Sequence, residues 1–328
     1  MKNILLIALF CAFLISCNNK QAETQADGLS GDLIIFHAGS LSVPFKEISS
    51  AFKKEYPGVN ILLEAAGSRT CARKITDLEK DCDIMASADY SVIDQLLIPD
   101  YASWNIKFAS NEMAIVYTEK SKFHEKINQD NWIDILLNEE VIYGRSDPDS
   151  DPCGYRAVLT MKLAEKHYER PGLADSLKAK NKNYIRPKET DLLGLLESGN
   201  IDYIFLYRSV AKQHGLKHLL LPDEINLKNP ELISLYNTAK VEISGKKPGE
   251  KITKQGEPMV YGITIINNAP NKEAALKFVE FLLKKDYGMK IMEKNGQPSI
   301  VPTKCENYGA VPLELKEFVK EWNNAVMQ

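Results

Sequence analysis

The sequence predicts an α/β fold built on a doubly wound sheet, and three observations support this. Short apolar runs rich in β-branched and aromatic residues alternate with segments whose apolar residues recur at helical spacing. Between residues 32 and 88 the order is strand, helix, strand, helix, strand. Gly-Ser pairs at 39–40 and 67–68 end the first two strands. Such a series implies parallel strands with helices on both faces, and ligands bind at the carboxyl ends of the strands.

The individual elements follow from the same patterns. Strands are predicted at 32–38, 59–66, 83–88, 113–117, 141–144, 201–207 and 260–266, with an extended segment at 183–186. Helices are predicted at 43–56, 71–80, 156–167, 190–198, 272–285 and 287–294. Pro57-Gly58 ends the first helix. No internal repeat, heptad run or low-complexity block interrupts this alternation.

Length and composition indicate an ordinary globular chain. It has 328 residues, 44% hydrophobic and 26% charged, which exceeds one average domain and excludes a disordered or multi-span membrane protein. Its 41 basic and 44 acidic residues give a net charge of −3. We therefore expect no nucleic-acid partner, because such proteins carry a strongly basic domain or stripe. The phosphate-loop pattern of nucleotide hydrolases is also missing from the sequence.

The first residues resemble a bacterial lipoprotein signal. Lys2 precedes the apolar run 4–15, which is short for a membrane span and ends in Leu-Ile-Ser before Cys17. We expect residues 1–16 to be a signal peptide, Cys17 to carry lipid, and the polar stretch 17–31 to be a flexible linker. The chain would then lie outside the cytoplasm, anchored to a bacterial membrane. The alternative is an ordinary signal peptide in which Cys17 is incidental.

Four other cysteines, Cys71, Cys82, Cys153 and Cys305, remain after the signal peptide and permit three pairings that the sequence cannot distinguish. Cys71 and Cys82 flank a predicted helix, which separates them by roughly 16 Å, so this pair is the least expected.

The two Gly-Ser turns are candidate anion sites. Ser40 and Ser68 stand at equivalent places in consecutive strand–helix units. A helix start offers free backbone N–H groups and a hydroxyl to an anion. The alternative for each serine is helix N-capping, the commonest role at this position.

An Asp-rich turn precedes the helix at 156–167. Asp147, Asp149 and Asp151 alternate, but the spacing lacks the glycine and glutamate of an EF-hand. Asp147 and Asp149 are interpreted as turn residues, whereas Asp151 adjoins Cys153-Gly154 at the helix start and points to a second anion cradle. Cys153 is also a candidate nucleophile there, although it lacks an identifiable His or Asn partner.

Several segments together resemble the molybdate/tungstate-binding proteins of ABC importers, particularly their tungstate-preferring branch. These segments are 37–41 (HAGSL), 67–69 (GSR), 83–90 (DIMASADY), 108–113 (FASNEM), 151–156 (DPCGYR) and 202–211 (DYIFLYRSVA). They occur in the same order, and the resemblance extends from about residue 32 to 328.

The resemblance implies a two-lobed periplasmic-binding fold of type II, each lobe a doubly wound mixed sheet, joined by a two-strand hinge. The crossings fall near Met113 and Gly262. Lobe one would comprise residues 32–112 plus 263–328, and lobe two residues 113–262.

The resemblance also implies a ligand site between the lobes. The residues that match the family's oxyanion ligands are Gly39, Ser40 and Ser68 in lobe one, and Cys153 through its N–H and Tyr207 through its phenol in lobe two. Asp151 and Glu189 match two carboxylates that coordinate the metal centre directly. Their alternatives are an N-cap for Asp151 and a solvated turn charge for Glu189.

The expected function is therefore that of a monomeric substrate-binding lipoprotein, without enzymatic activity or a resident cofactor. It would capture tungstate or molybdate and deliver it to an ABC permease. Two alternatives remain: a binding protein of the same fold for sulfate, phosphate or a ferric complex, and a secreted cysteine hydrolase.

Overall fold

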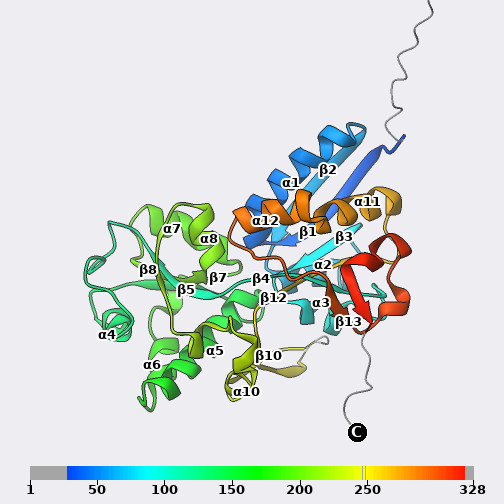
Figure 1. The fold of residues 1–328 in the computed structure, drawn as a ribbon. Helices are drawn as coiled ribbons and strands as arrows, with labels where there is room; N and C mark the ends of the chain where they lie inside the picture. Colours follow the sequence, from blue (N-terminus) through cyan, green and yellow to red (C-terminus); the bar gives the residue numbers. More distant parts are fainter. Residues whose placement is uncertain (1–27, 246, 248, 322–328) are drawn as a thin grey trace, which may run out of the picture.

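The computed structural model describes residues 28–245, 247 and 249–321, and its main feature is a pair of five-stranded mixed sheets (Figure 1). The first sheet has the order β2-β1-β3-β12-β4. Its strands are β1 (Gly31–Ala38), β2 (Val59–Ala66), β3 (Ile84–Ser87), β4 (Ile106–Ser110) and β12 (Val260–Ile265). Its helices are α1 (Ser42–Glu55), α2 (Ser68–Thr76), α3 (Tyr90–Leu96), α11 (Lys272–Leu283) and α12 (Lys290–Lys294).

The second sheet has the order β7-β6-β8-β5-β9. Its strands are β5 (Met113–Tyr117), β6 (Tyr143–Ser146), β7 (Ile185–Arg186), β8 (Tyr203–Tyr207) and β9 (Lys217–Leu220). Seven helices accompany it: α4 (Trp132–Leu137), α5 (Pro152–His167), α6 (Leu173–Ala179), α7 (Leu193–Glu197), α8 (Arg208–Gln213), α9 (Asp223–Asn226) and α10 (Ile233–Tyr236).

Both sheets share one topology. In the first, β1 pairs in parallel with β2 and β3, while β12 runs antiparallel to β3 and β4. In the second, β6 pairs in parallel with β7 and β8, while β5 runs antiparallel to β8 and β9. The antiparallel strand of each sheet adjoins a crossing of the chain between the sheets. The predicted α/β class with a mixed sheet in each lobe is confirmed.

The chain passes between the sheets in two places. The first passage is short, from the end of β4 at Ser110 to the start of β5 at Met113. The second follows the hairpin of β10 (Lys240–Ser244) and β11 (Lys251–Gln255), and β12 pairs with β4 from Val260 onward. The boundary expected between residues 262 and 263 therefore lies inside β12, and the lobe limits stay a prediction.

Two helices begin earlier than the sequence pattern predicts. The second helix starts at Ser68 instead of 71 and ends at Thr76 instead of 80. Helix α5 starts at Pro152 instead of 156, because the Asp151 side chain caps it and proline occupies its first position. Both shifts bring the Gly-Ser turn and the Asp-rich turn into direct contact with helix starts.

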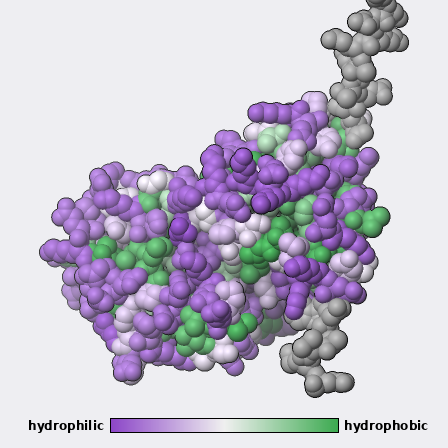
Figure 2. All heavy atoms as spheres, viewed as in Figure 1, coloured by the Kyte–Doolittle hydropathy of each residue, from purple (hydrophilic) through white to green (hydrophobic). Residues whose placement is uncertain are grey.

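Each sheet has its own packed aromatic groups. Phe45, Phe52 and Phe278 meet edge to face between α1 and α11. In the second lobe Trp132 packs edge to face on Phe205 of β8. Figure 2 shows that hydrophilic residues cover most of the visible face of both lobes.

The last described strands, β13 (Thr303–Cys305) and β14 (Val319–Glu321), form a separate parallel pair. All four cysteines between residues 28 and 321 are free and buried, so none of the three pairings forms here.

The predicted signal peptide 1–16, the lipid-bearing Cys17 and most of the linker 17–31 lie outside the described residues. At the end of that linker Leu29 is buried and Gly31 already opens β1. Within the described part of the chain, no helix has the length and apolar character needed to cross a membrane.

Candidate functional site

The two serines of the Gly-Ser turns are buried and do not cap their helices. Ser40 lies within the 3-10 turn η1 (Gly39–Leu41), and Ser68 is the first residue of α2, where Gly67 is the cap. The Ser68 hydroxyl accepts a hydrogen bond from the Ala88 N–H at 3.0 Å. Its own proton therefore stays available to an acceptor in the site, and the N-cap alternative is wrong for both serines.

A hydrogen-bond network behind Ser40 leaves the proton of its hydroxyl available in the same way. The Tyr261 hydroxyl accepts from the Asn111 amide at 2.7 Å and from the Gln297 amide at 3.3 Å. It then donates to the Ser40 Oγ at 3.1 Å. Ser40 can therefore donate its own proton elsewhere. Tyr261 and Gln297 were not predicted as site residues, because each is remote in sequence from every motif.

Asp151 joins two segments of the second lobe. Its carboxylate accepts from the Cys153 N–H at 3.1 Å and from the Glu189 N–H at 2.9 Å. It is both the N-cap of α5 and the anchor of the 3-10 turn η3 (Glu189–Leu192). The N–H that the resemblance assigned to ligand binding at Cys153 is thus bonded to Asp151 in this structure.

Glu189 is fully buried, so its interpretation as a solvated turn charge is wrong. Neither carboxylate oxygen has a hydrogen-bond partner. The carboxylate lies directly over Gly39 of the first lobe: a Cβ on Gly39 would come within 2.9 Å of Oε2 and 3.0 Å of Oε1. Only a residue without a side chain permits this approach.

The two carboxylates share an environment that disfavours charge. Burial raises the pKa of Asp151, and burial together with the charge of Asp151 raises the pKa of Glu189 well above its usual range. Among the ion pairs of the described residues, none involves either carboxylate. Nor does that part of the chain contain three or more His, Cys, Asp or Glu side chains placed to hold a metal ion. Within the described residues, the site thus has two carboxyl groups that form no ion pair.

Tyr207 and Ser68 meet across the lobes through Arg156. The buried Tyr207 hydroxyl, at the end of β8, accepts from Arg156 Nη1 at 3.0 Å. The same nitrogen donates to the Ala88 carbonyl at 2.7 Å, and the Ala88 N–H bonds Ser68. Arg156 lies in the run 151–156 that carries the resemblance, and this was the available signal for it.

Other contacts also join the two lobes. The Thr70 N–H on α2 donates to the Ser150 carbonyl at 3.3 Å, and Arg69 Nε donates to the Asp149 carbonyl at 3.1 Å. Asp89, the N-cap of α3, accepts from the Tyr155 hydroxyl of α5. The start of α2 and the Asp-rich turn therefore face each other in a closed arrangement.

Cys153 does not have the environment of a nucleophile. Its side chain is fully buried, and its Sγ lies 3.7 Å from the Phe205 carbonyl as a donor. Burial, with the charges of Asp151 and Glu189, raises the pKa of the thiol well above its usual range. Thiolate chemistry needs the opposite shift.

The predicted site residues thus come together with different degrees of directness. Gly39, Asp151, Cys153 and Glu189 are in contact or hydrogen-bonded, and Ser68 joins Tyr207 through Ala88 and Arg156. Ser40 follows Gly39 in the same turn, and Tyr261 holds its hydroxyl.

Comparison with known proteins places this geometry in a family. Residues 33–297 match the model of the bacterial extracellular solute-binding proteins. The chain is 51% identical to a solute-binding protein from Petrotoga mobilis over 300 residues, which covers 90% of this chain and 92% of that protein. It is 42% identical to the molybdate/tungstate-binding protein WtpA from Pyrococcus abyssi over 341 residues, which covers 95% and 97%.

Two solved structures show the same fold. The periplasmic molybdate-binding protein of Azotobacter vinelandii superimposes with a TM-score of 0.60 at 16% identity, covering 81% of this chain and 98% of that one. The sulfate-binding protein SubI of Mycobacterium tuberculosis has a TM-score of 0.57 at 14% identity, covering 82% and 87%. The resemblance to molybdate/tungstate-binding proteins is thereby confirmed, and the chain belongs to the family of bacterial extracellular solute-binding proteins.

Proposed function

We propose that this solute-binding protein captures tungstate or molybdate between its lobes and that Asp151 and Glu189 coordinate the metal centre. The observation that carries the proposal is the buried carboxylate of Glu189, whose two oxygens lack hydrogen-bond partners beside a second buried carboxylate. A buried polar group without a partner destabilises the protein, so its presence is best explained by a ligand that supplies the missing partner.

The chemistry of the ligand follows from this pair. Two carboxylates repel a sulfate or phosphate dianion in a desolvated cleft, and those anions have no compensating interaction. Tungsten(VI) and molybdenum(VI) are large, hard centres that expand from four to six oxygen ligands, and hard centres prefer carboxylate oxygen. The available protons of Ser40 and Ser68 suit the oxygen atoms of the same anion.

The donors are divided between the lobes in a manner that supports capture by closure. Gly39, Ser40 and Ser68 come from the lobe of the first sheet, and Asp151, Glu189 and Tyr207 from the lobe of the second. A ligand that bonds to both lobes stabilises the closed form over the open form.

We further propose that the chain is a lipoprotein anchored through Cys17 and that it delivers its ligand to an ABC permease as a monomer. The sequence Leu-Ile-Ser before Cys17 and the polar stretch after it support the anchor. Membership of an extracellular solute-binding family supports a transport role rather than a catalytic one.

Calorimetric titration of the mature protein with tungstate, molybdate, sulfate and phosphate tests the proposal. We expect tight binding of tungstate and molybdate and no appreciable cleft binding of sulfate or phosphate. Sulfate affinity comparable to that for tungstate would overturn the coordination by carboxylates and leave an ordinary tetrahedral oxyanion site.

A further inference from the structure

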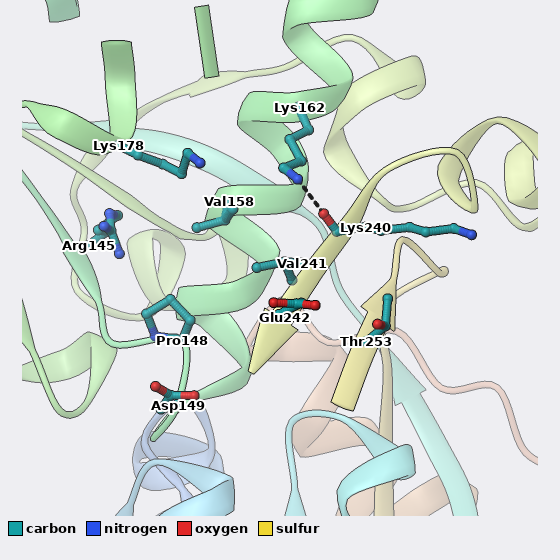
Figure 3. Close-up of a pocket in the computed structure, with 10 residues that line it drawn as sticks. All are labelled: Arg145, Pro148, Asp149, Val158, Lys162, Lys178, Lys240, Val241, Glu242 and Thr253. Carbon is teal, nitrogen blue, oxygen red and sulfur yellow. Dashed lines mark hydrogen bonds between the residues drawn. The ribbon is translucent and has the colours of Figure 1, made fainter. Parts of the chain in front are cut away.

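A cavity of about 620 Å³ lies in the second lobe, separate from the candidate site. Its walls are the end of β6, the turn 147–149, helices α5 and α6, and the β10-β11 hairpin (Figure 3). Three cationic side chains, Arg145, Lys162 and Lys178, line it against the carboxylates of Asp149 and Glu242, whereas Figure 3 shows the Lys240 ammonium pointing away from it. No step of the proposed capture of tungstate uses this cavity.

Arg145 is the feature that points to a ligand. Its side chain is only 9% exposed and lines the cavity, yet its Nη1 is buried without a hydrogen-bond partner. Asp147 is the acidic group whose charge acts on it, but that carboxylate accepts from the Ser150 hydroxyl at 2.7 Å and the Asp149 N–H at 3.1 Å. A buried guanidinium nitrogen without an acceptor favours the binding of an anion.

The neighbouring cations strengthen this preference. Figure 3 shows the Lys178 ammonium extending toward α5, where Lys162 lies on the opposite wall. Among the described residues, Lys178 forms a surface pair with Asp175 at 2.7 Å, which an anion can replace at little cost. Lys162 donates to the Lys240 carbonyl at 2.6 Å on the wall of the cavity.

The acidic lining residues are placed away from this cluster. Figure 3 shows Asp149 beyond Pro148 and Glu242 on the hairpin, both apart from Arg145 and Lys178. The Asp149 carboxylate is already bonded to the Ser244 N–H at 2.6 Å. Val158 and Val241 provide apolar wall between the two ends. The cavity is therefore cationic at one end and apolar in the middle.

We propose that this cavity binds a second, small anion: a phosphate or carboxylate group held by Arg145 and Lys178, with a short apolar body against Val158. Arginine presents paired N–H donors that match the oxygens of both groups. The proposal does not depend on the identity of the ligand bound between the lobes.

The test is calorimetry of the mature protein with inorganic phosphate, glycerol 3-phosphate and butyrate. Glycerol 3-phosphate adds a three-carbon chain to the phosphate, and butyrate replaces the phosphate with a carboxylate on an apolar chain. We expect one site with millimolar or tighter affinity. Arg145→Gln and Lys178→Ala should each weaken it about tenfold, the scale of a charge-assisted hydrogen bond. Lys217→Ala is the matched control, because Lys217 is a paired cation on β9, at the other edge of the same sheet.

Glu189→Gln distinguishes this cavity from the space between the lobes. The proposal is supported if Glu189→Gln leaves phosphate binding unaltered and Lys178→Ala weakens it. Absence of phosphate, glycerol 3-phosphate and butyrate binding overturns it, and so does phosphate binding that responds to Glu189→Gln instead. Lys178 is partly exposed and its replacement spares the core, so it decides the question if the Arg145 variant does not fold.

Discussion

At the scale of single residues, the buried carboxyl group of Glu189 lowers the stability of the unliganded protein. Both its oxygens are buried without partners, and its neighbour Asp151 is a second carboxylate rather than a cation. Such a pair costs free energy of folding, since buried carboxylates are normally paired or hydrogen-bonded. We therefore expect changes at Glu189 to affect stability and binding in opposite directions.

Glu189→Gln tests this expectation directly. If Glu189 coordinates the metal, loss of a charged ligand should weaken tungstate binding by roughly 1.5–3 kcal/mol, or about ten- to hundredfold. The same change should raise the thermal stability of the unliganded protein, because it removes a buried carboxyl group that folding must either protonate or bury with its charge. Asp191→Asn, on the exposed Asp191 of the same turn, serves as the control. Tighter binding together with four-coordinate tungsten in X-ray absorption spectra would contradict coordination and indicate a merely repelling charge.

His37 predicts a pH dependence of stability. Burial is the main cause that lowers its pKa from 6.5 to about 4, and its Nδ1 lies 2.8 Å from the Ala38 carbonyl. The folded state therefore requires the neutral ring. Its contribution is complete above the unfolded pKa and is lost as the pH falls toward the folded value, by about 2 kcal/mol at pH 5 relative to pH 7.5.

Urea unfolding of the wild type and His37→Gln at the two pH values measures this contribution. The wild type should lose more free energy of unfolding than the variant on acidification, by about that amount. Equal losses in the two proteins would mean that other groups cause the acid sensitivity.

At the scale of elements, the start of α2 fits closely against the Asp-rich turn. A Cβ on Gly67 would lie 2.4 Å from the Ser150 carbonyl oxygen and 3.0 Å from that of Pro187, both backbone atoms of the other lobe. Gly67 has φ −59 and ψ 139, which alanine adopts without strain. The conflict thus arises between lobes and not within α2.

Gly67→Ala should accordingly fold normally but close incompletely. We expect weaker tungstate binding, mainly because the ligand dissociates faster. The midpoint of thermal unfolding without ligand should be unchanged or slightly higher. Stopped-flow binding and thermal unfolding measure the two effects. Gly194→Ala is the matched control, because a Cβ there meets nothing within 4 Å. Wild-type affinity in Gly67→Ala would show that closure does not need this contact.

The sequence predicts an element well where the spacing of its own apolar residues identifies it. The strands β1, β2 and β8 and the helices α1 and α11 were predicted within a few residues, because each has a clear apolar period. Strand β4 and the hairpin β10-β11 were missed, since their residues are stabilised by pairing with distant strands. Helix α5 was predicted four residues late because capping by Asp151, not apolar spacing, sets its start.

The candidate site divides in the same way. The resemblance brought in Glu189, which residue type and spacing alone did not distinguish from a surface charge. Tyr261 and Gln297 were missed, because their role depends on bonds to Ser40, more than two hundred residues away in the chain. Contacts between remote segments have no periodic signature in a single sequence.

At the scale of the whole molecule, one buried ion cluster joins the lobes. Asp89 of the first lobe lies 3.2 Å from Lys254 on β11 and 3.9 Å from Arg156 on α5, and it also accepts from Tyr155. Burial alone would raise the pKa of Asp89, but the charges of Lys254 and Arg156 hold it below its usual range. Asp89 thus remains charged, and opening the lobes would separate it from these partners.

Asp89→Asn should therefore shift the protein toward its open form. The amide keeps an oxygen that can cap α3, where Asp89 accepts from the Ser91 N–H at 2.9 Å, but it leaves Lys254 and Arg156 buried without an anion in the closed form. Small-angle scattering should show a larger radius of gyration for the unliganded variant than for the wild type. Saturating tungstate should contract both proteins, the variant at a higher ligand concentration, because ligand binding must now also offset the two unpaired cations.

Two outcomes would contradict this prediction. If the radius of gyration without ligand is the same in both proteins, and tungstate leaves that of the wild type unchanged, neither this cluster nor the ligand controls closure. If tungstate contracts the wild type but Asp89→Asn has no effect, the ion cluster does not control closure and the ligand alone does.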